Sequence, residues 1–316
     1  MVETKVVSSE AKDFNKISGF GVKKADKAIF EPTVDSAFYV SADHNGLLDV
    51  VDTLSAQLPQ NVLLTGPQGC GKTELAIWFA AKYKRPCIIM NCATIRETKD
   101  WFGYRDAKAG TLSWHKSDFV RAIEQGNVIV VMDEFNRLHT TLHNSIYPLL
   151  DARRCTYVEE IGEMIHVGAG TVFVATANIG MAHVGTHTLD SAIEDRFAYR
   201  IDIAFPDAST EATIIRSKTN VSDRLAKKLA KFGADIRKKS MGATATLSRA
   251  VSTRQLLNTA IVMREFAKRG KPVAKAVDYT IVPYFSKEGG RESEQAQVLQ
   301  LVQGIFSSAS GGSDEG

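Results

Sequence analysis

The first two thirds of the chain carries five short hydrophobic runs that are rich in β-branched residues. They cover residues 61–65, 87–91, 128–132, 171–176 and 199–203. Runs of this length, bounded by polar residues, are typical of strands that are buried on both faces. Stretches with the apolar spacing of helices separate several of them, at residues 72–83, 117–125 and 138–151. The alternation predicts an α/β domain whose five-stranded parallel sheet is covered by helices on both faces.

After Pro206 the strand pattern ends and only helical spacing remains. The amphipathic stretches are residues 209–219, 222–240, 253–269, 273–284 and 292–302. The third has Ser252 as its expected N-cap and Gly270 just beyond its end. The predicted organisation is an N-terminal extension over residues 1–32, the α/β domain over 33–206, an all-α domain over 207–305 and a tail over 306–316. Both ends are expected to be flexible because they are polar.

Composition excludes several classes of protein. Of the 316 residues, 44% are hydrophobic and 24% are charged, which excludes a wholly disordered or collagen-like chain. No run reaches the roughly 18 apolar residues of a membrane span, and the first residues lack the apolar core of a signal peptide. The four cysteines form no CxxC pair, so neither a zinc site nor a disulfide scaffold is expected. We predict a cytoplasmic protein without membrane contact.

A phosphate-binding motif directly follows the first predicted strand. The sequence GPQGCGKT satisfies the pattern GxxxxGK[ST] and leads into a predicted helix. Its glycines let backbone N–H groups converge on a β-phosphate, Lys72 reaches the β- and γ-phosphates, and the Thr73 hydroxyl holds Mg²⁺. The predicted nucleotide-binding residues here are Gly66, Pro67, Gln68, Gly69, Cys70, Gly71, Lys72, Thr73 and Glu74. We interpret Cys70 as a variable position of the loop rather than a redox switch.

Two carboxylates stand at the end of the third predicted strand, in the sequence VIVVMDE. In open α/β sheets, ligands bind at this carboxyl edge. Asp133 is expected to position Mg²⁺ together with Thr73, and Glu134 to polarise the attacking water. Alone, such a pair often only begins a loop. Beside a complete phosphate loop, it predicts nucleotide hydrolysis.

The residues after these carboxylates narrow the family. The segment DEFNRLHTTLHNSIYPLLDARRCTYVEE and the later strand ending in ATAN resemble the MoxR group of AAA+ ATPases, over residues 38–205. Within that group the chain looks most like the small ATPase subunit of aerobic cobalt chelatase and its phage-borne relatives. The resemblance implies an AAA+ P-loop NTPase with a small all-α lid domain that binds ATP and Mg²⁺. We interpret the loop around Phe38 and Tyr39 as facing the base.

The resemblance assigns three further residues. Asn178, at the end of the ATAN strand, is the implied sensor of the γ-phosphate or the attacking water, and the alternative is a turn asparagine. Arg196 is the implied arginine finger that reaches the γ-phosphate of a neighbouring subunit, with Arg200 as the substitute. Arg254 is the implied lid arginine, which contacts phosphates within its own chain. The alternative partners of Arg196 are Asp190, Glu194 and Asp195.

Two β-hairpins are expected as insertions. The first pairs WFGYRD with TLSWHK around residues 107–110, and the second lies in RRCTYVEE and GEMIHVG. The resemblance to the family implies that the first hairpin faces the pore of a ring. The aromatic residues of the first hairpin either grip a polypeptide or, as is commoner at strand spacing, form a small core. They are Trp101, Phe102, Tyr104 and Trp114.

The leading hypothesis is a motor that forms a homo-oligomeric ring, expected to be a hexamer, and remodels or activates a partner protein. Members of the family usually act with a von Willebrand A-domain protein, so we expect one here. The alternative is a nucleic-acid-directed motor or loader that uses the basic stretch 221–240, which holds seven basic and two acidic residues. Its expected basic face consists of Arg224, Lys227, Lys228 and Lys231.

Two other signals favour no site. The formal net charge of the chain is only +3, which is too small to indicate nucleic-acid binding by itself. His139 and His143 are spaced i, i+4, but the segment lacks the glutamate and the third ligand of a zinc site. We therefore predict no metal site at this pair.

Overall fold

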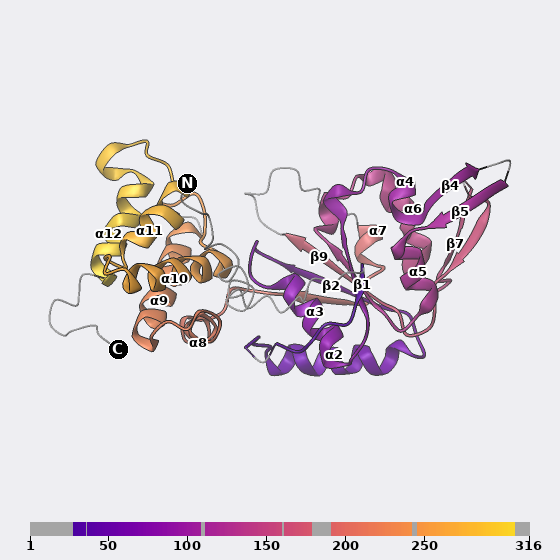
Figure 1. The fold of residues 1–316 in the computed structure, drawn as a ribbon, viewed down its shortest axis with the longest axis horizontal. Helices are drawn as coiled ribbons and strands as arrows, with labels where there is room; N and C mark the ends of the chain where they lie inside the picture. The colour runs from indigo at the N-terminus through magenta and orange to yellow at the C-terminus, as the bar shows by residue number, and fades with distance from the viewer. Residues whose placement is uncertain are drawn as a thin grey trace, which may run out of the picture. The chain divides into compact units, whose positions relative to one another are not determined.

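The computed structural model describes residues 28–35, 37–108, 111–159, 161–178, 191–241 and 245–306. They form two compact units, which meet in the sequence between Ala204 and Phe205 (Figure 1). The flexibility expected of the extension up to residue 27 and of the tail from residue 307 lies outside the described residues. No helix in the described ranges is both long and apolar enough to cross a bilayer.

The first unit is built on a six-stranded sheet with the strand order β1-β3-β6-β9-β2-β10. The strands are β1 Ile29–Phe30, β2 Gln60–Gly66, β3 Cys87–Asn91, β6 Ile129–Asp133, β9 Val172–Asn178 and β10 Tyr199–Asp202. All neighbours pair in parallel except β1, which pairs antiparallel with β3. The five predicted parallel strands are confirmed. The additional β1 has only two residues, too few for a hydrophobic pattern to reveal.

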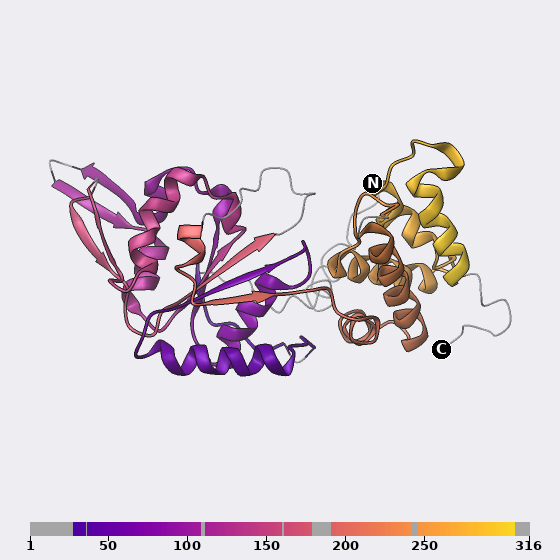
Figure 2. The same ribbon diagram turned by 180° about the vertical axis from the view of Figure 1, so that it is seen from behind.

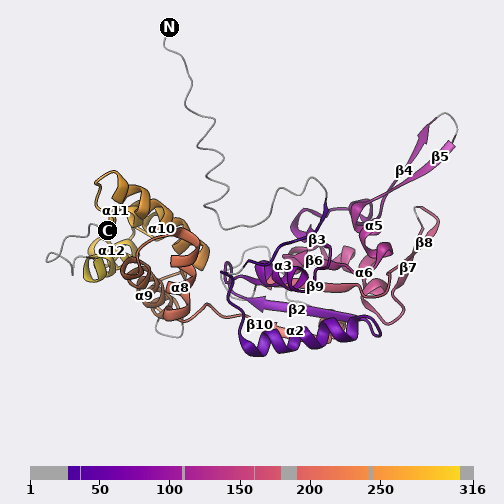
Figure 3. The same ribbon diagram turned by 60° about the horizontal axis from the view of Figure 1, so that its bottom comes forward.

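Helices cover both faces of this sheet because its strands send alternate residues to opposite sides. Helices α2 Ala42–Ser55 and α3 Lys72–Lys82 lie on one face, and α4 Thr98–Phe102, α5 Asp118–Gln125 and α6 Thr140–Leu150 lie on the other (Figures 1 and 3). On β2, Leu64 packs with Phe79 of α3 in the hydrophobic core on one face of the sheet. Leu63 packs with Phe119 of α5 in the core on the other face. The predicted covering of both faces is therefore confirmed.

Both predicted hairpins are present. They pair β4 Gly103–Lys108 with β5 Thr111–Lys116, and β7 Cys155–Val158 with β8 Glu163–His166. The Arg105 side chain donates to the Ile161 carbonyl, so the two hairpins lie side by side (Figure 3). One detail of the prediction is wrong: Trp101 and Phe102 end helix α4 and are buried in the core. Gly103, with φ of 97°, then turns the chain into β4.

The second unit consists of helices around one core (Figure 2). They are α8 Ala208–Thr219, α9 Asp223–Ser240, α10 Thr253–Lys268, α11 Lys275–Thr280 and α12 Glu294–Phe306. Ser252 caps α10 as predicted, and Gly270 follows its end with φ of 62°. The helix predicted over 273–284 ends early, at Thr280, because Pro283 disfavours helical backbone before it. A 3₁₀ turn over Val282–Tyr284 follows.

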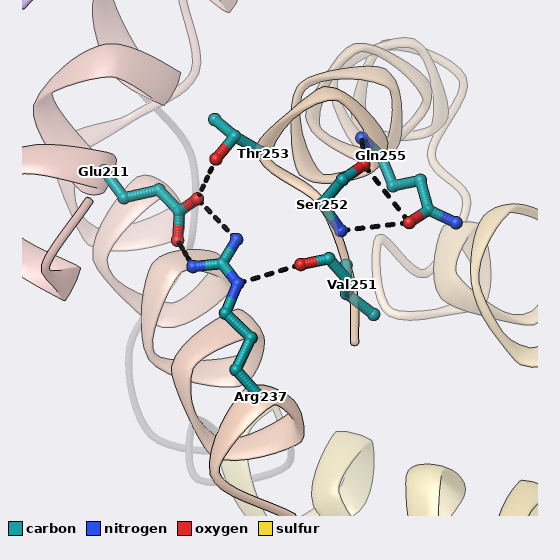
Figure 4. A network of polar contacts seen from close by, with 6 residues as sticks. All are labelled: Glu211, Arg237, Val251, Ser252, Thr253 and Gln255. Carbon is teal, nitrogen blue, oxygen red and sulfur yellow. Dashed lines mark hydrogen bonds and ion pairs between the residues drawn. The ribbon is translucent and has the colours of Figure 1, made fainter. Parts of the chain in front are cut away.

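A buried ion pair joins three helices of this unit (Figure 4). Glu211 of α8 is fully buried and accepts two hydrogen bonds from the Arg237 guanidinium of α9, at 2.8 and 2.7 Å. Thr253 of α10 donates a third, at 2.7 Å, and Arg237 Nε donates to the Val251 carbonyl. A buried pair is stable only when such hydrogen bonds satisfy its charges. Arg237 is thus internal, which removes one charge from the basic stretch 221–240.

Candidate nucleotide-binding and catalytic site

The phosphate loop connects β2 to α3 and depends on the backbone freedom of its glycines. Gly66, Gly69 and Gly71 have φ values of 147°, 74° and 104°, which side chains disfavour. A Cβ atom on Gly66 would also overlap the carbonyl oxygen of Ile203, which follows β10. Gly66 is therefore fixed by packing against β10 as well as by the shape of the loop.

Lys72 lies inside the arc of the loop. Its Nζ donates to the carbonyl oxygens of Gly66, at 3.0 Å, and Pro67, at 2.7 Å. Burial lowers the pKa of the Lys72 ammonium. The N-cap of α3 is Gly71, which has no side chain to accept hydrogen bonds from the first helical turn. A lysine and a helix N-terminus with such N–H groups together form a site for an anion.

The remaining loop residues surround this site without forming a second one. Gln68 is exposed, and Glu74 is half-buried in the first turn of α3. Burial raises the pKa of the Cys70 thiol, which disfavours the reactive thiolate that a redox switch requires. Phe38 packs beside Gly71, where a Cβ would lie 3.7 Å from its ring, and Tyr39 is exposed. The loop of Phe38 and Tyr39 thus lies beside the phosphate loop.

Thr73 and Asp133 meet at the carboxyl edge of the sheet. The Thr73 hydroxyl donates to Asp133 Oδ1 at 2.8 Å. Hydroxyl and carboxylate oxygens are hard ligands that suit Mg²⁺, which usually takes few protein ligands and completes its shell with phosphates and water. In the described ranges, no group of three or more His, Cys, Asp or Glu residues could hold a metal by itself. The pair therefore fits Mg²⁺ that arrives with a nucleotide.

Glu134 follows Asp133 in a left-handed conformation, with φ of 54° and ψ of 43°. Its carboxylate is partly exposed and lies 3.5 Å from Arg137 Nε. The Glu134 N–H donates to the Thr176 hydroxyl on β9, which in turn donates to Asp133. Sequence reasoning missed Thr176, because its role depends on a contact between two strands. Its place two residues before Asn178 was the available signal.

Asn178 ends β9 and pairs in register with Gly66, the first residue of the phosphate loop. It is buried, with 8% of its surface exposed. Asn136, in the turn after Glu134, donates from Nδ2 to the Asn178 carbonyl at 3.0 Å. The residues from 179 to 190, which follow Asn178, lie outside the described residues. The structure thus brings Asn178, Glu134 and the phosphate loop to one edge of the sheet.

Arg196 lies elsewhere in the same unit. Its Nε is 2.8 Å from Asp151 Oδ1, and its guanidinium lies 4.4 Å from the centre of the Tyr147 ring. Asn61, near the start of β2, donates to both the Arg196 and the Leu150 carbonyl oxygens. Asn61 and Gly66 are five residues apart, or about 16 Å along a strand. Arg196 is therefore remote from the phosphate loop of its own chain.

The other two arginines are placed differently. Arg200, on β10, is 3.5 Å from Glu194 and 3.4 Å from Asp202, in an exposed cluster. The ion pair of Arg196 is made with Asp151, which the sequence did not suggest as a partner. Arg254 is exposed in the first turn of α10, in the helical unit.

The aromatic residues of the first hairpin divide between two environments. Trp101 and Phe102 are core residues, so for them the interpretation as a small core is right. Trp114 is partly buried, and its Nε1 donates to the Phe102 carbonyl at 3.1 Å. Tyr104 is exposed and stacks on His115. Tyr157 and Met164 of the second hairpin are also exposed.

Comparison with known families agrees with this geometry. Residues 61–197 match the family described as AAA domain (dynein-related subfamily), and residues 211–300 match the CbbQ/NirQ/NorQ C-terminal family. The chain is 30% identical over 196 residues to the putative chaperone BssE of Thauera aromatica, covering 62% of this chain and 68% of BssE. It is 27% identical over 250 residues to protein NorQ of Paracoccus denitrificans, covering 79% of this chain and 87% of NorQ.

Solved structures show the same fold at low identity. The RuvB Holliday junction branch migration motor of Thermotoga maritima aligns with a TM-score of 0.54 and 17% identity, covering 89% of this chain and 82% of RuvB. The AAA domain of FIGL-1, solved with ADP, aligns with a TM-score of 0.51 and 14% identity, covering 96% and 92%. At this identity, the likeness concerns the fold alone.

Proposed function

Because this chain belongs to the MoxR-type AAA+ ATPases and is an ATP hydrolase, we propose that it assembles as a ring and uses Mg²⁺-dependent ATP hydrolysis to remodel or activate a partner protein. The observation that carries the proposal is the separation of Arg196 from its own phosphate loop. A finger so placed serves a nucleotide bound to a neighbouring subunit, so that hydrolysis requires assembly.

The residues of the site take the following proposed roles. Lys72 and the backbone N–H groups of residues 66–74 bind the phosphates, and Thr73 with Asp133 holds Mg²⁺. Glu134 orients and deprotonates the attacking water, and Asn178 positions that water or the γ-phosphate. Arg254 is the proposed lid arginine, and the closer likeness to the cobalt-chelatase subunit stays a prediction.

Assembly would require Arg196 to exchange one partner for another. In the single chain its charge is balanced by Asp151, whose side chain is 28% exposed. A phosphate presented by a neighbouring subunit offers more charge and a bidentate partner for the guanidinium. We propose that ATP at the interface draws Arg196 from Asp151 and so stabilises the ring.

The proposed partner is a protein. The relative named a putative chaperone supports this class, and the exposed Tyr104, Tyr157 and Met164 on adjacent hairpins offer an apolar surface for a client. We propose a von Willebrand A-domain protein as the companion, and a pull-down from the native host that recovers none would contradict it. We place the protein in the cytoplasm, which suits its four free cysteines.

The test of the proposed function is the solution mass of the Glu134→Gln protein, measured by light scattering with and without Mg²⁺-ATP. The substitution should preserve nucleotide binding and stop turnover, which traps the assembly that ATP favours. We expect a mass near six times the 34.6 kDa chain with ATP, and a smaller species without it. Lys72→Ala, which should not bind nucleotide, is the control and should stay small under both conditions.

Two results would contradict the proposal. A Glu134→Gln protein that remains a monomer at saturating ATP would exclude the ring and the role of Arg196 in trans. Robust hydrolysis by Glu134→Gln would refute the assignment of Glu134.

The nucleic-acid alternative has weaker support from the structure. Arg237 is buried, and Lys227 forms an ion pair of 2.6 Å with Asp223, so fewer free charges remain on α9 than the sequence suggested. It stays a prediction that hydrolysis measured at low salt with and without DNA or RNA would test. Hydrolysis that DNA and RNA do not stimulate would exclude the nucleic-acid-directed motor.

A further inference from the structure

Strands β6 and β9 are joined beyond the end of their backbone pairing. Their parallel register ends at Met132 and Ala175, after which β9 pairs only with β2. From this point, side chains make the connection: Thr176 of β9 contacts Asp133 and Glu134, and Asn136 of the following turn contacts Asn178. We call Thr176 and Asn136 the β6–β9 side-chain bridge.

The Thr176 hydroxyl makes two hydrogen bonds to consecutive residues. It donates to Asp133 Oδ1 at 2.6 Å and accepts from the Glu134 N–H at 3.0 Å. Thr176 is buried, with 1% of its surface exposed, so water does not compete for these bonds. Asp133 Oδ1 also accepts from Thr73 at 2.8 Å. One buried hydroxyl therefore fixes the orientation of Asp133 and the backbone of Glu134 together.

Glu134 needs such support because its backbone is left-handed. This conformation costs a residue with a side chain about 1–2 kcal/mol, and it persists where the surroundings hold it. The hydrogen bond from the Glu134 N–H to Thr176 is one such constraint. Since backbone conformation sets the direction of the Cα–Cβ bond, the same hydrogen bond fixes the point from which the Glu134 side chain extends.

Asn136 completes the bridge in the opposite direction. It is buried, and its Nδ2 donates to the backbone carbonyl of Asn178 at 3.0 Å. The residue two positions after Glu134 thus holds Asn178, while the residue two positions before Asn178 holds Glu134. Two hydrogen bonds of 3.0 Å thus connect the segment of Glu134 with the segment of Asn178.

We propose that Thr176 and Asn136 are positioning residues that couple the γ-phosphate sensor Asn178 to the orientation of Glu134. Neither acts on the substrate. The bridge makes Glu134 competent only when Asn178 is in the position that it takes beside a bound nucleotide. This inference rests on the proposed roles of Glu134 and Asn178.

The experiment compares Thr176→Val with Thr176→Ser. Valine keeps the shape and removes the hydroxyl, whereas serine keeps the hydroxyl. For Thr176→Val we expect kcat to fall about 10- to 100-fold, the loss typical of a misplaced catalytic group, while the Kd for ATP measured without Mg²⁺ changes less than about twofold. Thr176→Ser should restore most of kcat.

A matched control directly precedes the same strand, at the end away from the carboxylates. Thr171 is buried, and its hydroxyl donates to the Gly168 carbonyl at 2.8 Å, far from the carboxylates. Thr171→Val should lower the melting temperature by about as much as Thr176→Val does, but it should leave kcat unchanged. Asn136→Ala, the second bridge variant, should reproduce the loss of kcat, and its effect should not add to that of Asn178→Ala.

The inference is overturned if Thr176→Val and Asn136→Ala keep the wild-type kcat, or if Thr176→Ser is no better than Thr176→Val. Its failure is distinguishable from that of the proposed function. If Glu134→Gln is inactive and the bridge variants are fully active, only the coupling is wrong. If Glu134→Gln hydrolyses ATP normally, the proposed site itself is wrong.

Discussion

Two structural constraints act on Gly66 of the phosphate loop. In a motif, Gly66 appears as a residue that lets the backbone approach phosphate. The structure adds that Gly66 lies against the Ile203 carbonyl and has φ of 147°, so that even a methyl group would be excluded there. The neighbouring Ile203 N–H donates to the Thr65 carbonyl at 2.7 Å, which holds the two segments together. Gly66 is thus a packing residue as well as a loop residue.

Alanine at two glycines tests this interpretation. Gly66→Ala should lower the free energy of unfolding by about 2–4 kcal/mol, through backbone strain and overlap with Ile203. Gly46→Ala, in the exposed middle of α2 with open space around it, should raise the free energy by about 0.5–1 kcal/mol. Urea unfolding of both variants measures the difference. Equal effects of the two substitutions would refute the packing argument.

The sequence predicts those residues of the site that lie in short contiguous motifs. The phosphate loop, Asp133 and Glu134 were predictable because each is contiguous and adjoins a strand end. Thr176 and Asn136 were not, because Thr176 is 43 residues from Asp133 and acts only where β9 passes β6. The Asp151 partner of Arg196 was missed for the same reason. Contacts between distant segments become visible only once strand order is known.

At the scale of elements, caps and turn residues set most boundaries. Ser252 caps α10 in a reciprocal arrangement with Gln255, and Asp207 caps α8 through hydrogen bonds to the N–H groups of Ser209 and Thr210. The prediction failed where a short helix resembled a strand: Trp101 and Phe102 fit an aromatic strand pattern, but both belong to α4. Five residues are too few for helical periodicity to be distinguished from alternation.

The Asp207 cap should make the stability of α8 depend on pH. Hydrogen bonds from Ser209 and Thr210 hold the pKa of Asp207 well below its ordinary value of 3.8. The contribution of the Asp207 carboxylate to the free energy of unfolding is therefore complete above about pH 4. It is lost as the pH falls through the lower pKa that Asp207 has in the folded state. Asp207→Ala should lower the free energy of unfolding by about 1 kcal/mol at pH 7.

The matched variant is Asp207→Asn, which caps a helix without titrating. Thermal unfolding at pH 7 and pH 3 should show a smaller loss of stability at acid pH for Asp207→Asn than for the wild type. An identical pH dependence of the two proteins would show that the Asp207 carboxylate is not the titrating group.

At the scale of the whole molecule, the central question is whether two chains share one active site. Within one chain, Arg196 is anchored at the start of β2 through Asn61, while the phosphate loop begins at the other end of that strand. If one subunit supplies the nucleotide site and its neighbour supplies the arginine finger, a subunit that is defective in one role can be complemented by a subunit that is defective in the other. Two subunits that are defective in the same role cannot complement each other.

Mixing of inactive variants distinguishes these cases. Arg196→Ala keeps its nucleotide site but offers no finger, and Lys72→Ala offers a finger but no site. Each alone should lose about 10³-fold or more in kcat. The 1:1 mixture should hydrolyse ATP much faster than either variant does alone. Lys72→Ala mixed with Glu134→Gln is the control and should stay inactive, because both damage the same half. A mixed ring of Arg196→Ala and Lys72→Ala without activity would contradict the finger in trans.

The chain after β10 contributes to both units within three residues. Ile203 touches the phosphate loop at Gly66, and Phe205 lies 4.1 Å from the Arg237 guanidinium of the buried ion pair. Only Ala204 separates them. The backbone therefore passes from a contact in the phosphate loop to a contact in the buried ion pair within residues 203–205. An insertion after Ala204 would lengthen this connection without replacing a residue of either contact.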